Sequence, residues 1–511
     1  MGSNTSGPEE DLCLATESEF QQLASMGSSC SAPEEDLVLP QQQIVCLPSA
    51  PEEGMSRSFS GGKSLQCYGE LVVQTEWGDP TSYVVRTRGI WAVWWHAAFD
   101  HAADAERLFV QLEEVREDCL QNLGMADPPN PQRGSFYNIY IHHKEDNFPS
   151  GWACGQGTDK FRLPYLTLPG DGMHRQEKTI YHEGFHIFQY RATSKGFEYT
   201  GNSQWYIEAT AQWYMVQKRP AEREMFVEAS CISMNPHLAL WHTIENGASQ
   251  DAKDWLYMCR LYALNTWLIY LTEVAGVPSP IITDGFYAGT TMSPQKYNFT
   301  RVGEALREHF ADWAARNAAG LHNGFDYLNA SQRDRARQEL DNLTQHGHSS
   351  ISNRHEFAAV MKAPMAGCPV RFRPTACIPR GWAYNVVRVH LKGTAAYTLR
   401  LNGDARGSQG KAAKFLGRVV VGAKTRGFEM SDASRSWPLT VQVAECDKEM
   451  FVVIISVPEH FDGNQTYGYE IEIEEGAWAT PGQQIGGAAA SSADEMRRKR
   501  LESLERRNQH G

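Results

Sequence analysis

A short pentad, His182-Glu183-Gly184-Phe185-His186, constrains the fold of this chain more than any other feature. Residues four apart lie on the same face of an α-helix, so a helix through the pentad directs both imidazoles toward one point. Glu183 lies about 100° further round the helix axis, where its carboxylate can reach a water molecule beside that point. The chain must therefore form a helix here and bring a third group to the same point from elsewhere in the sequence.

The third group is expected downstream of the pentad. The extended H-E-x-x-H-x-x-G-x-x-H pattern fails, because Gln189 and Ala192 occupy the positions of its glycine and its third histidine. An apolar, helix-competent segment carries Glu208, and a break at 196–203 lets two helices pack side by side. Glu198 is a competing ligand but falls within that break. Two histidines, one glutamate and an open fourth position are the ligand set of a catalytic zinc site.

This ligand set indicates a chemistry. Zn²⁺ lowers the pKa of a bound water to about 7, and a neighbouring carboxylate can then take its proton. We therefore expect a zinc-dependent hydrolase of peptide bonds, with His182, His186 and Glu208 as ligands and Glu183 as general base. The alternative is a catalytically inactive binding or scaffold protein of similar shape. The developing oxyanion needs a hydrogen-bond donor; the candidates are Tyr206, Tyr214, His237 and His242.

Around these residues the sequence resembles the gluzincins, metallopeptidases in which a downstream glutamate completes the pentad. More narrowly, 66–476 resembles a poorly characterised, avirulence-protein-like group of mostly secreted bacterial metallopeptidases. The likeness also rests on five weaker stretches, at 89–99, 137–143, 151–157, 309–318 and 450–473. The resemblance implies an α+β fold, with a zincin-like, largely helical peptidase domain that has a small sheet, followed by an all-β sandwich domain.

Changes of composition divide the 511 residues into four parts. Residues 1–63 are rich in Ser, Glu, Pro and Gln, repeat a PEED unit, and are expected to be a disordered tail. The peptidase domain is expected over 64–368. A β-sandwich is expected over 369–478, where short alternating segments are separated by Gly, Asn and Asp. A linker and a charged helix are expected over 479–511.

The expected elements of the peptidase domain follow from the spacing of apolar residues. Alternating segments at 82–88, 136–143 and 162–168 predict strands. We expect the last of these to be the edge strand beside the cleft, where a substrate backbone can pair. The most apolar run, 255–274, is interrupted by charged residues and predicts a core helix rather than a membrane span. Further helices are predicted over 102–123, 299–317 and 330–346.

Histidines and cysteines outside the pentad show no second metal-binding pattern. His142 and His143 are neighbours on a predicted strand, whose successive side chains face opposite ways, so structural roles are expected. The eleven cysteines have no C-x-x-C spacing, which argues against zinc–thiolate and redox motifs. Reduced, mostly buried thiols are expected; the alternative is a few disulfides, with Cys368 and Cys377 as the closest pair in the folded region.

Charge and the amino-terminal residues bear on partners and location. A net charge of −13, without a basic patch before the last twenty residues, argues against nucleic acid and leaves a peptide or protein substrate as the expected partner.

The start lacks the basic and apolar regions of a signal peptide. This favours a cytoplasmic or membrane-associated protein; secretion, as in the resembling group, is the alternative. Gly2 lies in an M-G-x-x-x-[ST] myristoylation pattern, and one acyl chain is a weak membrane tether.

Overall fold

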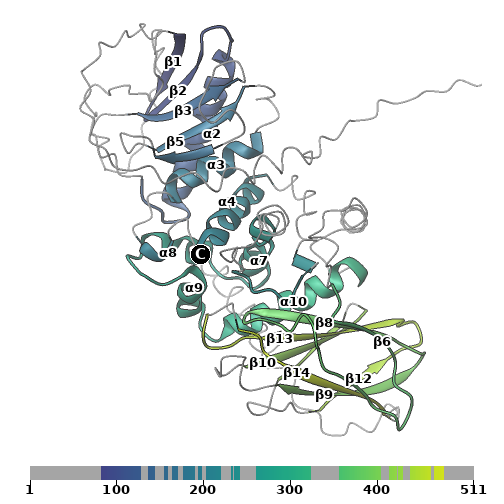
Figure 1. Ribbon diagram of the computed structural model, residues 1–511. Helices are drawn as coiled ribbons and strands as arrows, with labels where there is room; N and C mark the ends of the chain where they lie inside the picture. Colours follow the sequence, from purple (N-terminus) through teal and green to yellow (C-terminus); the bar gives the residue numbers. More distant parts are fainter. Residues whose placement is uncertain are drawn as a thin grey trace, which may run out of the picture.

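The computed structural model describes residues 82–127, 136–143, 155–158, 164–170, 177–189, 194–197, 203–219, 232–233, 235–241, 260–323, 356–403, 414–422, 424–429, 438–461 and 465–476. The predicted tail 1–63, the helix 330–346 and the part after 478 lie outside these residues. Within them the chain has a mixed α+β architecture, which confirms the predicted class. A sheet lies at one end, helices occupy the middle, and a second β-region lies at the other end (Figure 1).

The first sheet has five strands in the order β1-β2-β3-β5-β4. The strands β2, β3 and β5 run parallel, and each outer strand is antiparallel to its neighbour. Their residues alternate between two apolar faces, which accounts for the aromatic-rich sequence of β2. The strands span Tyr83–Arg88 (β1), Trp91–His96 (β2), Tyr137–His142 (β3), Gly155–Thr158 (β4) and Pro164–Pro169 (β5).

The prediction that 162–168 forms the edge strand is wrong. The corresponding strand β5 lies between β3 and β4, with Leu166 opposite Ile139 on one side and Gln156 on the other. The edge is β4, a four-residue strand that the composition of its GQGT sequence did not indicate. Its pairing with β5 is a long-range backbone interaction, so residue type alone does not reveal it.

Two helices pack together beneath this sheet. The helix α2 (Ala102–Gln121) connects β2 to β3, and α3 (Glu177–Gln189) follows β5. Buried Leu108, Leu112 and Val115 form one stripe of α2, as its spacing predicts. Gly184 of α3 lies against this stripe, where an added Cβ would meet Leu112 Cδ2 at 3.2 Å. The glycine inside the pentad thus allows α3 to lie close to α2.

The middle of the molecule is helical. The helix α4 is buried along almost its whole length and packs against α3 and α7. After α3 and the short η5 (Lys195–Phe197), the helical elements are α4 (Gln204–Lys218), α7 (Asn265–Ile269), the π-helical η8 (Tyr270–Val274), α8 (Ser279–Tyr287), α9 (Pro294–Val302) and α10 (Ala305–Asn323).

Two of the predicted helices are interrupted. The run 255–274 is not one regular helix, because a turn at Leu264 precedes α7 and a π-helix follows it. The predicted helix 299–317 divides into α9 and α10 at Gly303, whose φ of 72° lies outside the right-handed helical region. No described helix has both the length and the apolar character needed to span a membrane.

The carboxyl-terminal region contains two sheets that face each other in a sandwich-like arrangement (Figure 1). One has the order β11-β10-β13-β8-β6, with β6 (Ala359–Lys362), β8 (Ala383–His390), β10 (Phe415–Val421), β11 (Lys424–Glu429) and β13 (Glu449–Ser456). The other has the order β12-β9-β14-β7, with β7 (Val370–Phe372), β9 (Ala395–Gly403), β12 (Leu439–Val443) and β14 (Tyr469–Gly476). Because β6 pairs with β8, the sheet begins before the predicted boundary at residue 369.

The larger of these sheets is covered on both faces. Along β13, Val452 packs in the core between the two sheets, while Val453 packs in the core shared with the helices. On the helical side, Arg418 of β10 donates to Asp312 at 2.7 Å and to Glu308 at 2.6 Å, both on α10. The helices and the sandwich-like region therefore share one apolar core.

The cysteines of the described residues are not paired. Cys119, Cys368, Cys377 and Cys446 have free thiols, so the candidate Cys368–Cys377 disulfide is absent. Cys119 is buried on α2, whereas Cys368 and Cys446 are exposed.

Candidate metal centre

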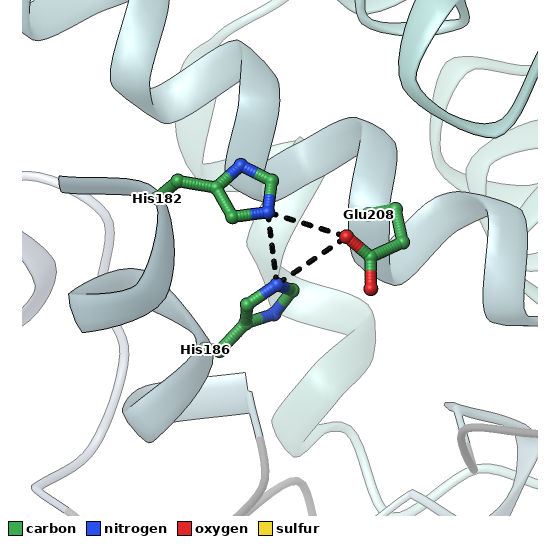
Figure 2. Close-up of side chains that lie close together, drawn as sticks. All are labelled: His182, His186 and Glu208. Carbon is green, nitrogen blue, oxygen red and sulfur yellow. Dashed lines mark hydrogen bonds and ion pairs between the residues drawn. The ribbon is translucent and has the colours of Figure 1, made fainter. Parts of the chain in front are cut away.

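Three side chains from two helices meet at one point. His182 and His186 come from α3 and Glu208 comes from α4 (Figure 2). The distances are 3.1 Å between the two Nε2 atoms, 3.2 Å from His182 Nε2 to Glu208 Oε2, and 3.4 Å from His186 Nε2 to the same oxygen. Among the described residues, these three form the group that could hold a metal ion. The sequence predicted these three side chains, and the structure brings them together.

The size of this triangle fits a zinc site. A tetrahedral Zn²⁺ with bonds of about 2.0–2.1 Å separates its N and O ligands by about 3.3–3.4 Å, close to the three distances between these atoms. The imidazole planes of His182 and His186 meet at 82°, so the rings converge at an angle instead of facing one another. Two imidazole nitrogens and a carboxylate oxygen are all electron-pair donors. The donor set and its spacing therefore fit a divalent cation.

Burial and charge prepare Glu208 for this position. Its side chain is 3% exposed. Burial alone would raise its pKa, but the attraction of His186 and the close approach of both imidazoles outweigh burial and hold the pKa of Glu208 well below its usual range. The third candidate ligand is thus a carboxylate at neutral pH, as metal binding requires.

A glutamine joins the two helices beside the site. Gln189, in the last turn of α3, has Oε1 at 2.6 Å from His186 Nδ1. Its Nε2 donates to the backbone carbonyl of Ile207 at 3.0 Å and to Thr210 Oγ1 at 2.5 Å, both on α4. This bridge holds α4 against α3 at the turn that carries Glu208.

Glu183 lies beside the triangle, and one of its carboxylate oxygens has no hydrogen-bond partner among the described residues. Its side chain is buried, at 9% exposure, and Oε2 has no hydrogen-bond partner among the described residues. Burial raises the pKa of Glu183 to about 7, with His182 lowering it and Glu208 raising it. A buried, unpartnered carboxylate costs folding free energy.

Two of the sequence candidates for an oxyanion donor have structural roles. The Tyr206 hydroxyl donates to Ile282 O at 2.9 Å and accepts from Asn298 Nδ2 at 2.9 Å. Tyr214 stacks on Phe185 at 4.7 Å between ring centres. His237 lies in the loop 235–241 and is half-buried. His242 and the competing ligand Glu198 lie outside the described residues.

The structure places a different tyrosine next to the site. The ring of Tyr262 lies 5.9 Å from the ring of His182, centre to centre, and is half-buried. The sequence did not indicate Tyr262, because it stands in the most apolar run of the chain, which predicts core packing. The available sequence signal was Arg260, a charged residue two positions before Tyr262 in this apolar run. In the structure, Arg260 donates to the carbonyls of Asn235, Leu238 and Ala239.

A second pair of histidines lies between α2 and β3. His101, at the N-cap of α2, has Nδ1 at 2.7 Å from Asp104 Oδ2 and Nε2 at 2.7 Å from His143 Nε2. The His143 ring also stacks on Phe99 at 3.6 Å. His143 directly follows β3, and both histidines are 7% exposed. No sequence pattern connects the two histidines, because they are 42 residues apart.

Comparisons with known proteins give a match to one family and likenesses to solved structures. Residues 96–253, which include the pentad and Glu208, match a family of unknown function (DUF6055). No curated protein matches the chain. Among solved structures, it is similar to the pre-peptidase C-terminal domain of a collagenase from Bacillus anthracis, with 6% identity over 23% of this chain and 94% of that one and a TM-score of 0.15. It is also similar to a family GH115 4-O-methyl-alpha-glucuronidase, with 11% identity over 70% of this chain, about half (54%) of the other, and a TM-score of 0.15. At these TM-scores neither likeness bears on the fold.

Proposed function

We propose that this protein is a zinc-dependent hydrolase of peptide bonds with a zincin-like catalytic region. The observation that carries the proposal is the triangle of His182 Nε2, His186 Nε2 and Glu208 Oε2, with edges of 3.1–3.4 Å. Beside it lies Glu183, a buried carboxylate whose Oε2 has no partner among the described residues. Three ligands and an adjacent free carboxylate are the composition of a catalytic zinc site rather than of a closed structural one.

In the proposed reaction, the ligands and Glu183 have separate roles. His182, His186 and Glu208 would hold Zn²⁺, which when bound would lower the pKa of a water to about 7 and polarise the scissile carbonyl. Glu183 takes a proton from the attacking water at its free oxygen. The same carboxyl group then delivers the proton to the nitrogen of the leaving amine, as a general acid.

Tyr262 is the proposed hydrogen-bond donor to the oxyanion. It is the tyrosine whose ring lies beside His182, at 5.9 Å between centres. Its side chain is half-buried. A donor placed before the reaction stabilises the negative charge that develops on the carbonyl oxygen.

The test combines metal content with a conservative variant. We expect the purified protein to contain about one zinc per chain and to cleave members of a peptide library. Glu183→Gln should keep the zinc and lose cleavage, while Glu106→Gln, an exposed carboxylate paired with Arg86 and Arg88, should keep both. Stoichiometric zinc without turnover of any peptide would favour the non-catalytic binding protein. A protein that binds no zinc would refute the proposal.

A further inference from the structure

We infer that Gln189 is a positioning residue that sets the tautomer of His186 and thereby couples metal binding to the docking of α4 on α3. This inference rests on the proposed function, because it concerns the same metal centre. It adds a residue that stood in the sequence only as a departure from the longer H-E-x-x-H-x-x-G-x-x-H pattern.

The carbonyl of Ile207 fixes the orientation of the Gln189 amide. A primary amide has an oxygen that accepts and a nitrogen that donates, and the two ends can be exchanged by rotation. One end of Gln189 lies 3.0 Å from the carbonyl oxygen of Ile207. A backbone carbonyl can only accept, so the nitrogen must face Ile207. The opposite orientation would place two oxygens against each other.

The orientation of the Gln189 amide determines which nitrogen of His186 carries the hydrogen. With Nε2 committed to Ile207, Oε1 of Gln189 faces His186 Nδ1 at 2.6 Å. An amide oxygen accepts, so Nδ1 must carry the hydrogen. A neutral imidazole carries one hydrogen, which leaves a lone pair on Nε2. That Nε2 is the atom of His186 that faces His182 Nε2 and Glu208 Oε2.

Residues of α4 fix the amide of Gln189, so both helices determine the tautomer of His186. Ile207, whose carbonyl fixes the amide, directly precedes Glu208, the third ligand. Thr210, one turn further on, accepts from the same amide nitrogen at 2.5 Å and donates back to Tyr206 O at 2.7 Å. The turn of α4 that carries Glu208 therefore also sets the tautomer of His186, through Gln189. His182 has no such partner, since its Nδ1 is buried and without a hydrogen bond among the described residues.

The test measures zinc affinity of the full chain by competition with a chromogenic chelator. Gln189→Leu removes both halves of the bridge, and we expect the affinity for Zn²⁺ to fall 10- to 100-fold, the range typical for partners of metal ligands. Gln189→Glu keeps an acceptor for His186 Nδ1 but loses the donor to α4 and sets a second oxygen against the Ile207 carbonyl, so it should lose less affinity for Zn²⁺ than Gln189→Leu, about threefold to tenfold. Thr210→Val removes one anchor of the amide nitrogen and leaves Ile207 in place, and should also stay within about threefold. Equal losses for Gln189→Leu and Gln189→Glu would overturn the inference, because the glutamine would then act only as a link between helices.

A second measurement applies even if Gln189→Leu does not fold or zinc does not bind. In the metal-free wild type, nitrogen NMR of histidine-labelled protein, assigned with His186→Ala, should show His186 with its hydrogen on Nδ1. A hydrogen mainly on Nε2 would overturn the inference. Because this measurement needs no metal, it separates a failure of the tautomer argument from a failure of the proposed zinc site.

Discussion

The molecule contains two buried pairs of histidines, and the pairs differ in how their rings approach. In the His101–His143 pair the Nε2 atoms are 2.7 Å apart, the ring centres are 5.0 Å apart, and the planes differ by 25°. In the His182–His186 pair the nitrogens are further apart, at 3.1 Å, yet the ring centres are closer, at 4.8 Å, and the planes differ by 82°. The first pair therefore meets nitrogen to nitrogen, and the second converges on a point to one side.

This difference in direction separates proton binding from cation binding. Asp104 accepts from His101 Nδ1; in a neutral His101 this leaves a lone pair on Nε2, to which His143 Nε2 donates. A hydrogen fills the space between two rings that meet head-on. The converging Nε2 atoms of His182 and His186 instead leave room for a third ligand, Glu208, and a cation. Nearly equal separations thus give a structural hydrogen bond in one pair and a candidate metal site in the other.

The largest expected difference between the pairs is in metal content. His182→Ala removes one of three ligands, and we expect bound zinc to fall from about one per chain to none detectable by elemental analysis. His143→Ala should keep the zinc and lower the free energy of unfolding by about 2 kcal/mol, through the lost hydrogen bond and ring contact. Zinc loss in His143→Ala, or retention in His182→Ala, would reverse the assignment of the two pairs.

The next largest effect concerns Glu183, which has no counterpart at the His101–His143 pair. Loss of a general base costs about 10²- to 10⁴-fold in rate, so Glu183→Gln should lower kcat/KM for a cleaved peptide by that factor with zinc retained. A fall of less than about tenfold would show that another group takes the proton.

The same substitution should stabilise the metal-free protein. Burial raises the pKa of Glu183 to about 7 in the folded state from an ordinary value of 4.5, so the folded protein binds the proton more tightly than the unfolded chain. The stability is fully present below pH 4.5 and is lost as the pH rises through about 7. Over this range the free energy of unfolding of the chelated wild type should therefore fall by up to about 3 kcal/mol relative to that of Glu183→Gln. A wild type whose stability rises from pH 5 to 7.5, compared with the variant, would contradict this.

Removal of the metal should also distinguish the pairs. A ligand that binds only the folded state at 1,000 times its Kd stabilises it by about 4.1 kcal/mol, so excess zinc should raise the melting temperature of the chelated wild type. Differential scanning calorimetry should show the same rise for His101→Ala, which belongs to the other pair, and none for His186→Ala. A rise in His186→Ala would place the zinc elsewhere.

The smallest expected effect comes from Gly170, which follows β5 and lies under the His143 ring. An added Cβ would lie 2.1 Å from His143 Nε2, so Gly170→Ala must displace the imidazole. We expect a loss of about 1–3 kcal/mol in denaturant unfolding and an unchanged affinity for zinc. A change in zinc affinity would show that the two pairs are coupled.

Local patterns predicted much of the fold and of the candidate site. Spacing of four on a helix places His182 and His186 together, and an apolar helix after a break supplies Glu208, because these are short-range properties of the chain. Alternating residues likewise predicted most strands of the sandwich-like region. Where local patterns compete with long-range pairing they failed, as for the edge strand, which is β4 and not the predicted 162–168.

By itself the sequence determined which residues can share a helix face and where the chain breaks between the two helices of the site, since periodicity along the chain encodes both. Only the tertiary structure decided which side chains from distant segments meet. Gln189 reaches Ile207 across two helices, Tyr262 comes beside His182 from an apolar run, and His143 meets His101 from another strand. Such contacts depend on the packing of whole elements against one another, a three-dimensional relation that no spacing along the chain contains.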